Sequence, residues 1–290
     1  HCIKGMNVEE SDRTPLDYAN DFIAFAKFTR SKYIVPFASS HIYLHPLSRK
    51  FNKYYSDPAF IKKEFDNKID TSQECVLMPS NSSWSKQGGF ELRNFDFSKI
   101  NEDISEYYKK NMSKITKQND LEFKRKLNKT AFNNYYGNFL KSLPSKVLDF
   151  KFSFLIYEKI SNSIFLCIID GRNSKTQIVE IDSEKDIYKF NLNFVIKTPI
   201  YIFNDCNQKM MHNTFAASKL LEISILSKNG IKDLSNYFSF IDLYENDCLP
   251  LYKMLSLRNI LIILRRWREF FDMIYFFYHI KIKRRKINQL

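Results

Sequence analysis

The stretch IFLCIIDGRNSKTQIVEI, residues 164–181, contains two β-prone runs on either side of a turn signal. The first run, 164–169, is almost continuously apolar, and the second, 176–181, alternates apolar with polar side chains. Asp170-Gly171-Arg172-Asn173 between them consists of residues that hairpin turns favour. The stretch therefore predicts a β-hairpin, and it places a sheet in the second half of the chain.

The segments around this hairpin predict further strands and helices. Phe152, Phe154 and Ile156 alternate with their neighbours, as in a strand with one buried face. Further strands are predicted over 191–196 and 218–225, and helices over 122–140, 198–211 and 234–244. These segments predict that strands and helices alternate irregularly in the second half of the chain.

The first part of the chain predicts helices and short strands. Thr14-Pro15-Leu16-Asp17 has the capping residues of a helix start, and Asp57-Pro58 starts a second helix. A short apolar run at 33–35, followed by Pro36, predicts a buried strand, and residues 74–78, followed by Pro79, predict a second strand. Residues 80–89 predict a polar loop. The whole chain is thus expected to be of the α/β (α+β) class.

Composition excludes several classes of protein. Apolar residues make up 44% of the 290 and charged residues 27%, which excludes a disordered chain. Six glycines are too few to favour a glycine-rich phosphate loop, and no apolar run has the length of a membrane span. The five cysteines are scattered without a C-x-x-C pair, so we expect reduced thiols in a cytoplasmic protein.

The net charge of +13 is concentrated at the C-terminus, where residues 257–290 contain nine basic and two acidic side chains. Apolar residues from Leu257 to Tyr278 recur at i, i+3, i+4 and i+7, so residues 249–290 predict an amphipathic helix and a basic tail. This helix could pack on the protein body, lie weakly on an anionic membrane, or bind nucleic acid. We favour packing on the body, and no motif supports nucleic acid.

His41 and His45 are the candidate metal ligands, because they follow a predicted buried strand in the segment Pro36–Pro46. Loops after strands are held by rigid backbone and often carry ligands. Histidine binds both zinc and iron. On spacing alone, however, H-x-x-x-H without a glutamate more often describes a surface or hydrogen-bonded histidine pair.

The segment KYIVPFAS, residues 32–39, followed by His45-Pro46, resembles the C-terminal part of a metallo-β-lactamase-fold domain, in the form found in CMP-N-acetylneuraminate hydroxylase-like proteins. Val76-Leu77-Met78-Pro79 resembles the next strand and loop, although Ser80-Asn81-Ser82 replaces the usual P-G-D. The resemblance covers residues 1–95 and implies the second half of a four-layer αββα sandwich. It also implies that His45, or His41 as the nearer alternative, binds zinc or iron in an intact parent protein.

The family's main metal signature, H-x-H-x-D-H, is absent from this chain. The resemblance therefore implies that a metal-binding half precedes His1 in a longer parent. On that basis we expect this chain alone to be inactive and to hold no zinc or iron tightly. An in-frame H-x-H-x-D-H in the upstream DNA would favour the enzyme.

Residues 121–248 resemble, more distantly, a sterol-carrier-like domain, which a helical linker over 96–120 would join to the first. Such a domain often has an apolar cavity, although abundant Phe and Tyr fit a packed core equally well. The preferred interpretation is part of a metal-dependent hydrolase of the metallo-β-lactamase superfamily, acting on an unidentified small-molecule or anionic substrate. The alternative is a non-catalytic binding module that holds an apolar or lipid-like ligand.

Overall fold

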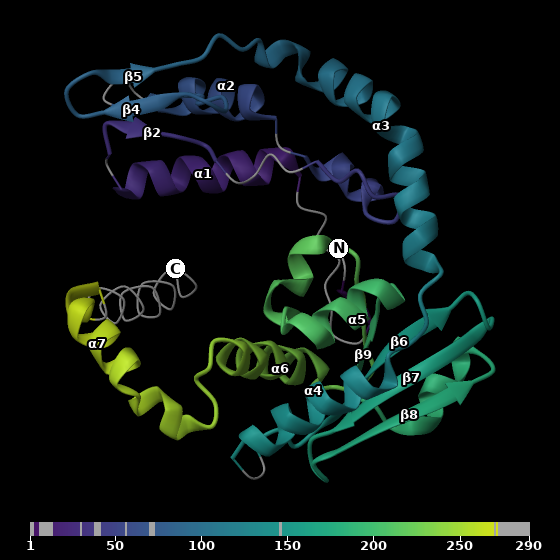
Figure 1. The fold of residues 1–290 in the computed structure, drawn as a ribbon. Coiled ribbons are helices and arrows are strands. Elements are labelled where there is room, and N and C mark those ends of the chain that lie inside the picture. Colours follow the sequence, from purple (N-terminus) through teal and green to yellow (C-terminus); the bar gives the residue numbers. More distant parts are fainter. Residues whose placement is uncertain are drawn as a thin grey trace.

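The computed structural model describes residues 3–5, 14–29, 31–37, 42–55, 57–69, 73–144, 147–269 and 271. The chain is a mixed α and β protein in which two groups of elements are joined by the long helix α3 (Ile100–Phe123) (Figure 1). The domain boundaries drawn from the sequence stay a prediction.

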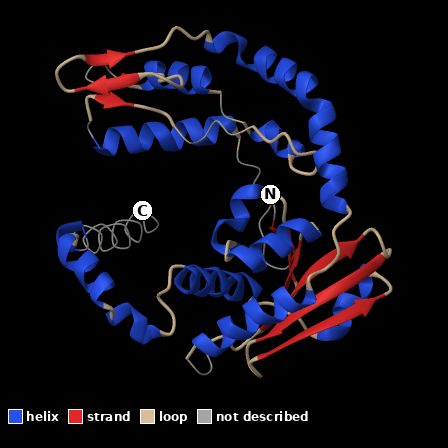
Figure 2. Cartoon of the chain, in the orientation of Figure 1, coloured by secondary structure: helices blue, strands red, loops and turns tan. Residues whose placement is uncertain are grey.

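A six-stranded mixed sheet, in the order β1-β10-β9-β6-β7-β8, organises the larger group (Figure 2). β6, β7 and β8 pair as antiparallel neighbours, whereas β9 is parallel to β6 and antiparallel to β10. β1 pairs in parallel with β10, so the first strand completes a sheet built mostly from the second half of the chain. The strands are β1 (Ile3–Gly5), β6 (Lys151–Glu158), β7 (Ser163–Asp170), β8 (Lys175–Ile181), β9 (Phe194–Lys197) and β10 (Glu222–Ile225).

The predicted hairpin is confirmed as β7 and β8, which pair from Ile164–Ile181 to Asp170–Lys175. In its turn, the Asp170 carboxylate accepts a hydrogen bond from the backbone N–H of Asn173 at 3.1 Å. Gly171 is required because a Cβ there would lie only 2.3 Å from the carbonyl oxygen of Leu148. The turn chemistry seen in the sequence therefore produces the expected local structure.

Three helices cover one face of this sheet: α4 (Lys129–Ser142), α5 (Ile200–Lys209) and α6 (Gly230–Glu245). A 3-10 helix, Glu184–Phe190, packs on the other face. Phe152, Phe154 and Ile156 point into the helix-covered core, whereas Leu155 belongs to the opposite cluster. The predicted strand is thus confirmed, but both of its faces are buried rather than one, because the sheet is covered on both sides.

The smaller group has its own core between two helices and a short parallel strand pair. α1 (Pro15–Thr29) and α2 (Pro58–Lys68) pack together beside β2 (Tyr33–Ile34) and β3 (Glu74–Cys75). The buried residues of this core are Ile23, Ala26, Ile34, Phe65 and Cys75.

Both helix starts predicted in this region are confirmed by their caps. The backbone N–H of Thr14 donates to the Asp17 carboxylate at 2.7 Å, and the N–H of Asp17 donates back to the Thr14 hydroxyl at 3.3 Å. Asp57 accepts a hydrogen bond from the N–H of Ala59 at 2.8 Å. These caps satisfy backbone donors that a helix start otherwise leaves unpaired.

Three predicted elements were wrong in detail. The polar loop 80–89 contains β4 (Ser83–Ser85), which pairs with β5 (Gly89–Glu91) around the Gly-Gly turn. The helix expected over 122–140 is two helices, because Asn128 caps a new one through the N–H of Ala131 at 2.9 Å. The strand expected over 218–225 begins only at Glu222, because a 3-10 helix occupies 212–218 and Lys219 follows it with a φ of 53°.

The C-terminal region also differs from the prediction. In place of one helix from Pro250, the structure has a 3-10 helix, Leu251–Leu255, and then α7 (Leu257–Arg265). The apolar side chains of α7 are exposed and α7 stands away from the sheet (Figure 1). The expected packing on the protein body was therefore wrong for the described part of this region. Residues 272–290 lie outside the described residues.

Candidate functional site

A pocket of about 380 Å³ lies where one edge of the six-stranded sheet meets residues 47–51. The parallel strands β6 and β9 both end at this edge, and the antiparallel strand β10 begins there. The side chains next to these strand ends line the pocket. The carboxyl ends of parallel strands are favoured positions for ligands, because a rigid sheet holds the loops that follow.

The pocket lining is largely apolar. Leu47 and Phe51 come from the segment before α2, and Phe123 is the last residue of α3. Leu220 and Leu221 come from the segment just before β10. These side chains meet at one place although they come from segments far apart in the chain. A lining of this kind suits a ligand with a hydrocarbon part better than a fully polar ligand.

Four lysines surround this apolar lining: Lys50, Lys159, Lys197 and Lys219. Lys197 is neutralised, because its ammonium lies 2.6 Å from the Glu184 carboxylate. The other three form no ion pair with any described residue. The Lys159 ammonium lies 3.7 Å from the centre of the Phe123 ring, which keeps its charge over the apolar wall.

The second acidic residue of the pocket, Glu222, is also neutralised. Its carboxylate pairs with Lys4 of β1, which is not part of the lining. The hydrogen bond from Lys4 holds the pKa of Glu222 below its usual value. Because both carboxylates are paired, the lysines leave the pocket with an excess of positive charge.

His45, the sequence-predicted metal ligand, lies next to this pocket in a hydrogen-bonded cluster. Its Nδ1 accepts a hydrogen bond from the N–H of Leu47 at 3.2 Å. Its Nε2 lies 2.8 Å from the Tyr201 hydroxyl and 3.4 Å from the Glu122 carboxylate. Burial and the nearby Glu122 carboxylate raise the pKa of Tyr201, so its hydroxyl stays protonated. Both imidazole nitrogens thus have protein partners.

The described residues contain no group of three or more His, Cys, Asp or Glu side chains arranged to hold a metal ion. His41, the second predicted ligand, lies outside the described residues. The distance between the two histidines is therefore not described, and their role as metal ligands stays a prediction.

A second pocket, of about 370 Å³, lies at the carboxyl ends of β2 and β3. Phe37 and residues 77–80 line it, and these segments carry the resemblance to the metallo-β-lactamase fold. Among the described residues that line it, Arg93 is the one charged side chain, and His45 is not one of them. A pocket therefore lies at the strand ends where the sequence places a metal site, but most of the side chains that line it are apolar.

Tyr201 links the His45 cluster to α5, so loss of its hydroxyl should lower the stability of the protein. Tyr201→Phe is expected to lower the free energy of unfolding by about 1 kcal/mol, because the partly buried His45 and Glu122 side chains lose a shared partner. Urea unfolding followed by circular dichroism measures this. Tyr188→Phe is the matched control, since Tyr188 is 73% exposed and should change stability by less than about 0.5 kcal/mol. Equal effects of the two changes would show that the cluster contributes nothing.

The described cysteines are free thiols, as the sequence predicted. Burial raises the pKa of Cys75 to about 11 and that of Cys206 to about 12, and it also raises the pKa of Cys167. These three thiols are therefore protonated at neutral pH and poorly suited to act as nucleophiles.

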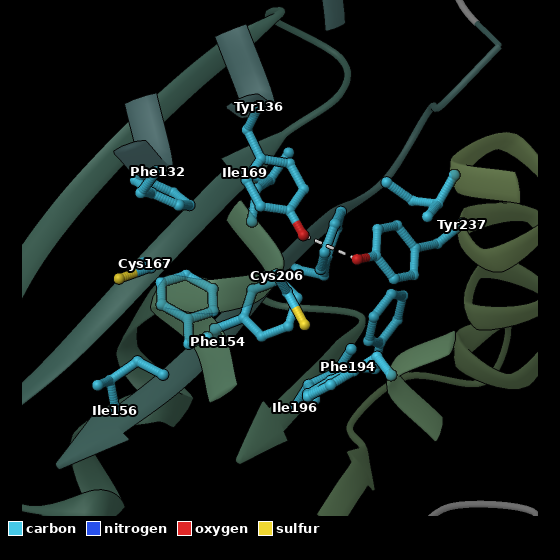
Figure 3. Packing of buried hydrophobic residues seen from close by; sticks show 14 of the residues in the cluster. Phe132, Tyr136, Phe154, Ile156, Cys167, Ile169, Phe194, Ile196, Cys206 and Tyr237 are labelled. Carbon is cyan, nitrogen blue, oxygen red and sulfur yellow. Dashed lines mark hydrogen bonds between the residues drawn. The ribbon is translucent and has the colours of Figure 1, made fainter. Parts of the chain in front are cut away.

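His212 is fully buried at the centre of the aromatic core. Its Nε2 donates to the Asn207 side-chain oxygen at 3.0 Å, and its Nδ1 faces the Tyr136 hydroxyl at 3.5 Å. Figure 3 shows Tyr136 and Tyr237 pointing toward one another, with their hydroxyls 2.8 Å apart. Burial lowers the pKa of His212 to about 3, so the ring is neutral at physiological pH. Its burial and its contacts with Asn207 and Tyr136 indicate a structural role in the core.

No protein-family model, no curated protein and no solved structure matches this chain.

Proposed function

We propose that this chain is a non-catalytic binding module that holds an amphipathic ligand with an apolar body and an acidic group, such as a fatty acid or a related lipid. The ligand's apolar body lies in the pocket beside Leu47, Phe51 and Leu221. Its carboxylate or phosphate meets the lysines around the pocket. One observation carries the proposal. Lys50, Lys159 and Lys219 surround an apolar lining, and none of the three has an ion-pair partner among the described residues.

The volume of the pocket fits part of such a ligand. At about 380 Å³ it lies within the range of small-molecule pockets, which is roughly 300–1,000 Å³. The two carboxylates of the lining compete little with the ligand's acidic group for Lys50, Lys159 and Lys219. Glu184 is paired with Lys197, and Glu222 is paired with Lys4. This arrangement favours an anion over a cation or a neutral polar ligand.

The other functional expectations remain proposals. Residues 32–46 still support a distant relation to the metallo-β-lactamase fold, and zinc or iron binding by an intact parent stays a prediction. The weaker likeness of residues 121–248 to a sterol-carrier-like domain agrees with a lipid-like ligand. No described helix is both long and apolar enough to cross a membrane, and the scattered free thiols support a cytoplasmic location.

Binding of a dansyl-labelled fatty acid tests the proposal. The unmodified chain should bind the probe, and an unlabelled fatty acid should displace it far better than the alcohol of equal length. Lys50→Glu combined with Lys159→Glu should weaken binding by roughly ten-fold or more, because it replaces two attractive charges with repulsive ones.

The matched control is Lys110→Glu combined with Lys114→Glu on the exposed surface of α3, which changes the net charge equally. It should bind the probe as the unmodified chain does. Equal binding by the pocket variant, or equal displacement by the acid and the alcohol, would contradict the proposal. Circular dichroism of both variants shows whether the fold is retained.

A further inference from the structure

A run of exposed apolar side chains lies at the C-terminal end of the described chain. Leu257, Ile260, Leu261 and Leu264 are four of the exposed side chains of α7, and Leu257 is 74% exposed. Their spacing of three, four and seven residues places them on one face of the helix. Trp267 and Phe271 follow and are also exposed. A monomer in water does not usually leave such a continuous apolar face uncovered.

The charged residues around this face are nearly all basic. Residues 251–271 contain five basic side chains and one acidic side chain, Glu269. Glu269 is paired with Arg266, and Lys253 is paired with Asp247. Arg258, Arg265 and Arg268 form no ion pair with any described residue. Arg258 and Arg265 lie seven residues apart and therefore on the same flank of α7.

The positive charge beside this apolar face indicates which partner covers it. A second copy of α7, packed face to face, would bring its own unpaired arginines close to these, which opposes association. An anionic bilayer supplies a partner for both kinds of side chain on α7. Its apolar interior can contact the leucines, and its negative headgroups can pair with the arginines. No helix in the described part of the chain is long and apolar enough to cross a membrane, so α7 would lie along the surface.

We propose that residues 251–271 bind the surface of an anionic lipid bilayer, with the apolar face of α7 inserted below the headgroups and its arginines among them. Trp267 lies just after α7 and is placed to enter the boundary between headgroups and acyl chains, where tryptophan is favoured. This surface is separate from the proposed ligand pocket. It would bring a lipid-binding module to the place where its ligand is found.

Co-sedimentation of the whole chain with vesicles tests this proposal. The protein should sediment with phosphatidylcholine vesicles that contain phosphatidylglycerol, and much less with pure phosphatidylcholine. Leu261→Glu combined with Leu264→Glu, and separately Arg258→Glu combined with Arg265→Glu, should each lower the partition coefficient about ten-fold or more. The control is Lys110→Glu combined with Lys114→Glu, which has the same charge change as the arginine variant and should bind normally.

Tryptophan fluorescence supplies a second measurement, because the chain has only two tryptophans. In a Trp84→Phe background, the emission of Trp267 should shift to the blue with anionic vesicles and stay unchanged with neutral ones. Failure to sediment with anionic vesicles, or an equal loss of binding in the α3 control, overturns the proposal. So does a concentration-dependent dimer that Leu261→Glu and Leu264→Glu abolish, which would make a second copy the partner.

Discussion

Phe154→Ala is expected to lower the free energy of unfolding by about 3–5 kcal/mol, the usual cost of removing a large aromatic side chain from a core. Phe154 is fully buried on β6, and its ring lies 4.8 Å from that of Phe203 on α5 and 5.8 Å from that of Tyr136 on α4. The change would therefore open a cavity between the sheet and two of its covering helices (Figure 3). Urea unfolding followed by circular dichroism measures the loss.

Phe28→Ala is the control for Phe154→Ala. Phe28 is 71% exposed on α1, so the same chemical change there should alter the free energy of unfolding by less than about 0.5 kcal/mol. Phe154→Leu should lie between the two, because leucine refills part of the cavity. If the Phe154→Ala and Phe28→Ala chains unfold at the same urea concentration, the core assignment of β6 is wrong.

Local features of the fold could be predicted because local residues determine them. The turn at Asp170-Gly171-Arg172-Asn173 fixes the β7–β8 hairpin through the hydrogen bonds that Asn173 donates to the Asp170 carboxylate. Thr14 and Asp17 form their reciprocal cap from residues three apart. In each case the interacting groups are neighbours in the sequence, so their pattern is visible there.

Pairings between distant segments could not be predicted in the same way. β1 joins the sheet beside β10, with Ile3 paired to Ile223, and β6 lies parallel to β9 across an intervening hairpin. Nothing in three residues such as Ile3–Gly5 specifies a partner so far along the chain. These pairings decide which strand ends meet at one edge of the sheet, and so they decide where the pocket lies.

The candidate site was therefore only partly visible in the sequence. His45 was singled out, and the structure places it beside the pocket, but hydrogen-bonded to Leu47 and Tyr201. Lys50, Lys159 and Lys219 were missed, because a lone lysine gives no signal until the fold brings several together. The basic, apolar-lined edge is a property of the tertiary structure, not of any one motif.

Acidification is expected to destabilise the protein through His212. The pKa of this buried ring is lowered to about 3, whereas an unfolded histidine titrates near 6.5. Between these values the unfolded chain binds a proton that the folded chain does not, so the free energy of unfolding falls as the pH falls. The slope from this one residue approaches about 1.4 kcal/mol per pH unit, and the loss between pH 7 and pH 5 is about 2 kcal/mol.

Comparison with His212→Gln isolates this contribution from those of the carboxylates. Glutamine can keep the donor to Asn207 but cannot titrate, so the variant should be the less stable chain at pH 7 because its packing is poorer. Its disadvantage should shrink by about 2 kcal/mol at pH 5, since only the unmodified chain must keep a histidine neutral there. Parallel loss of stability in both chains over this range would show that His212 is protonated in the folded core. The aromatic rings around it, and the hydroxyl pair of Tyr136 and Tyr237, would then have to accommodate a charge.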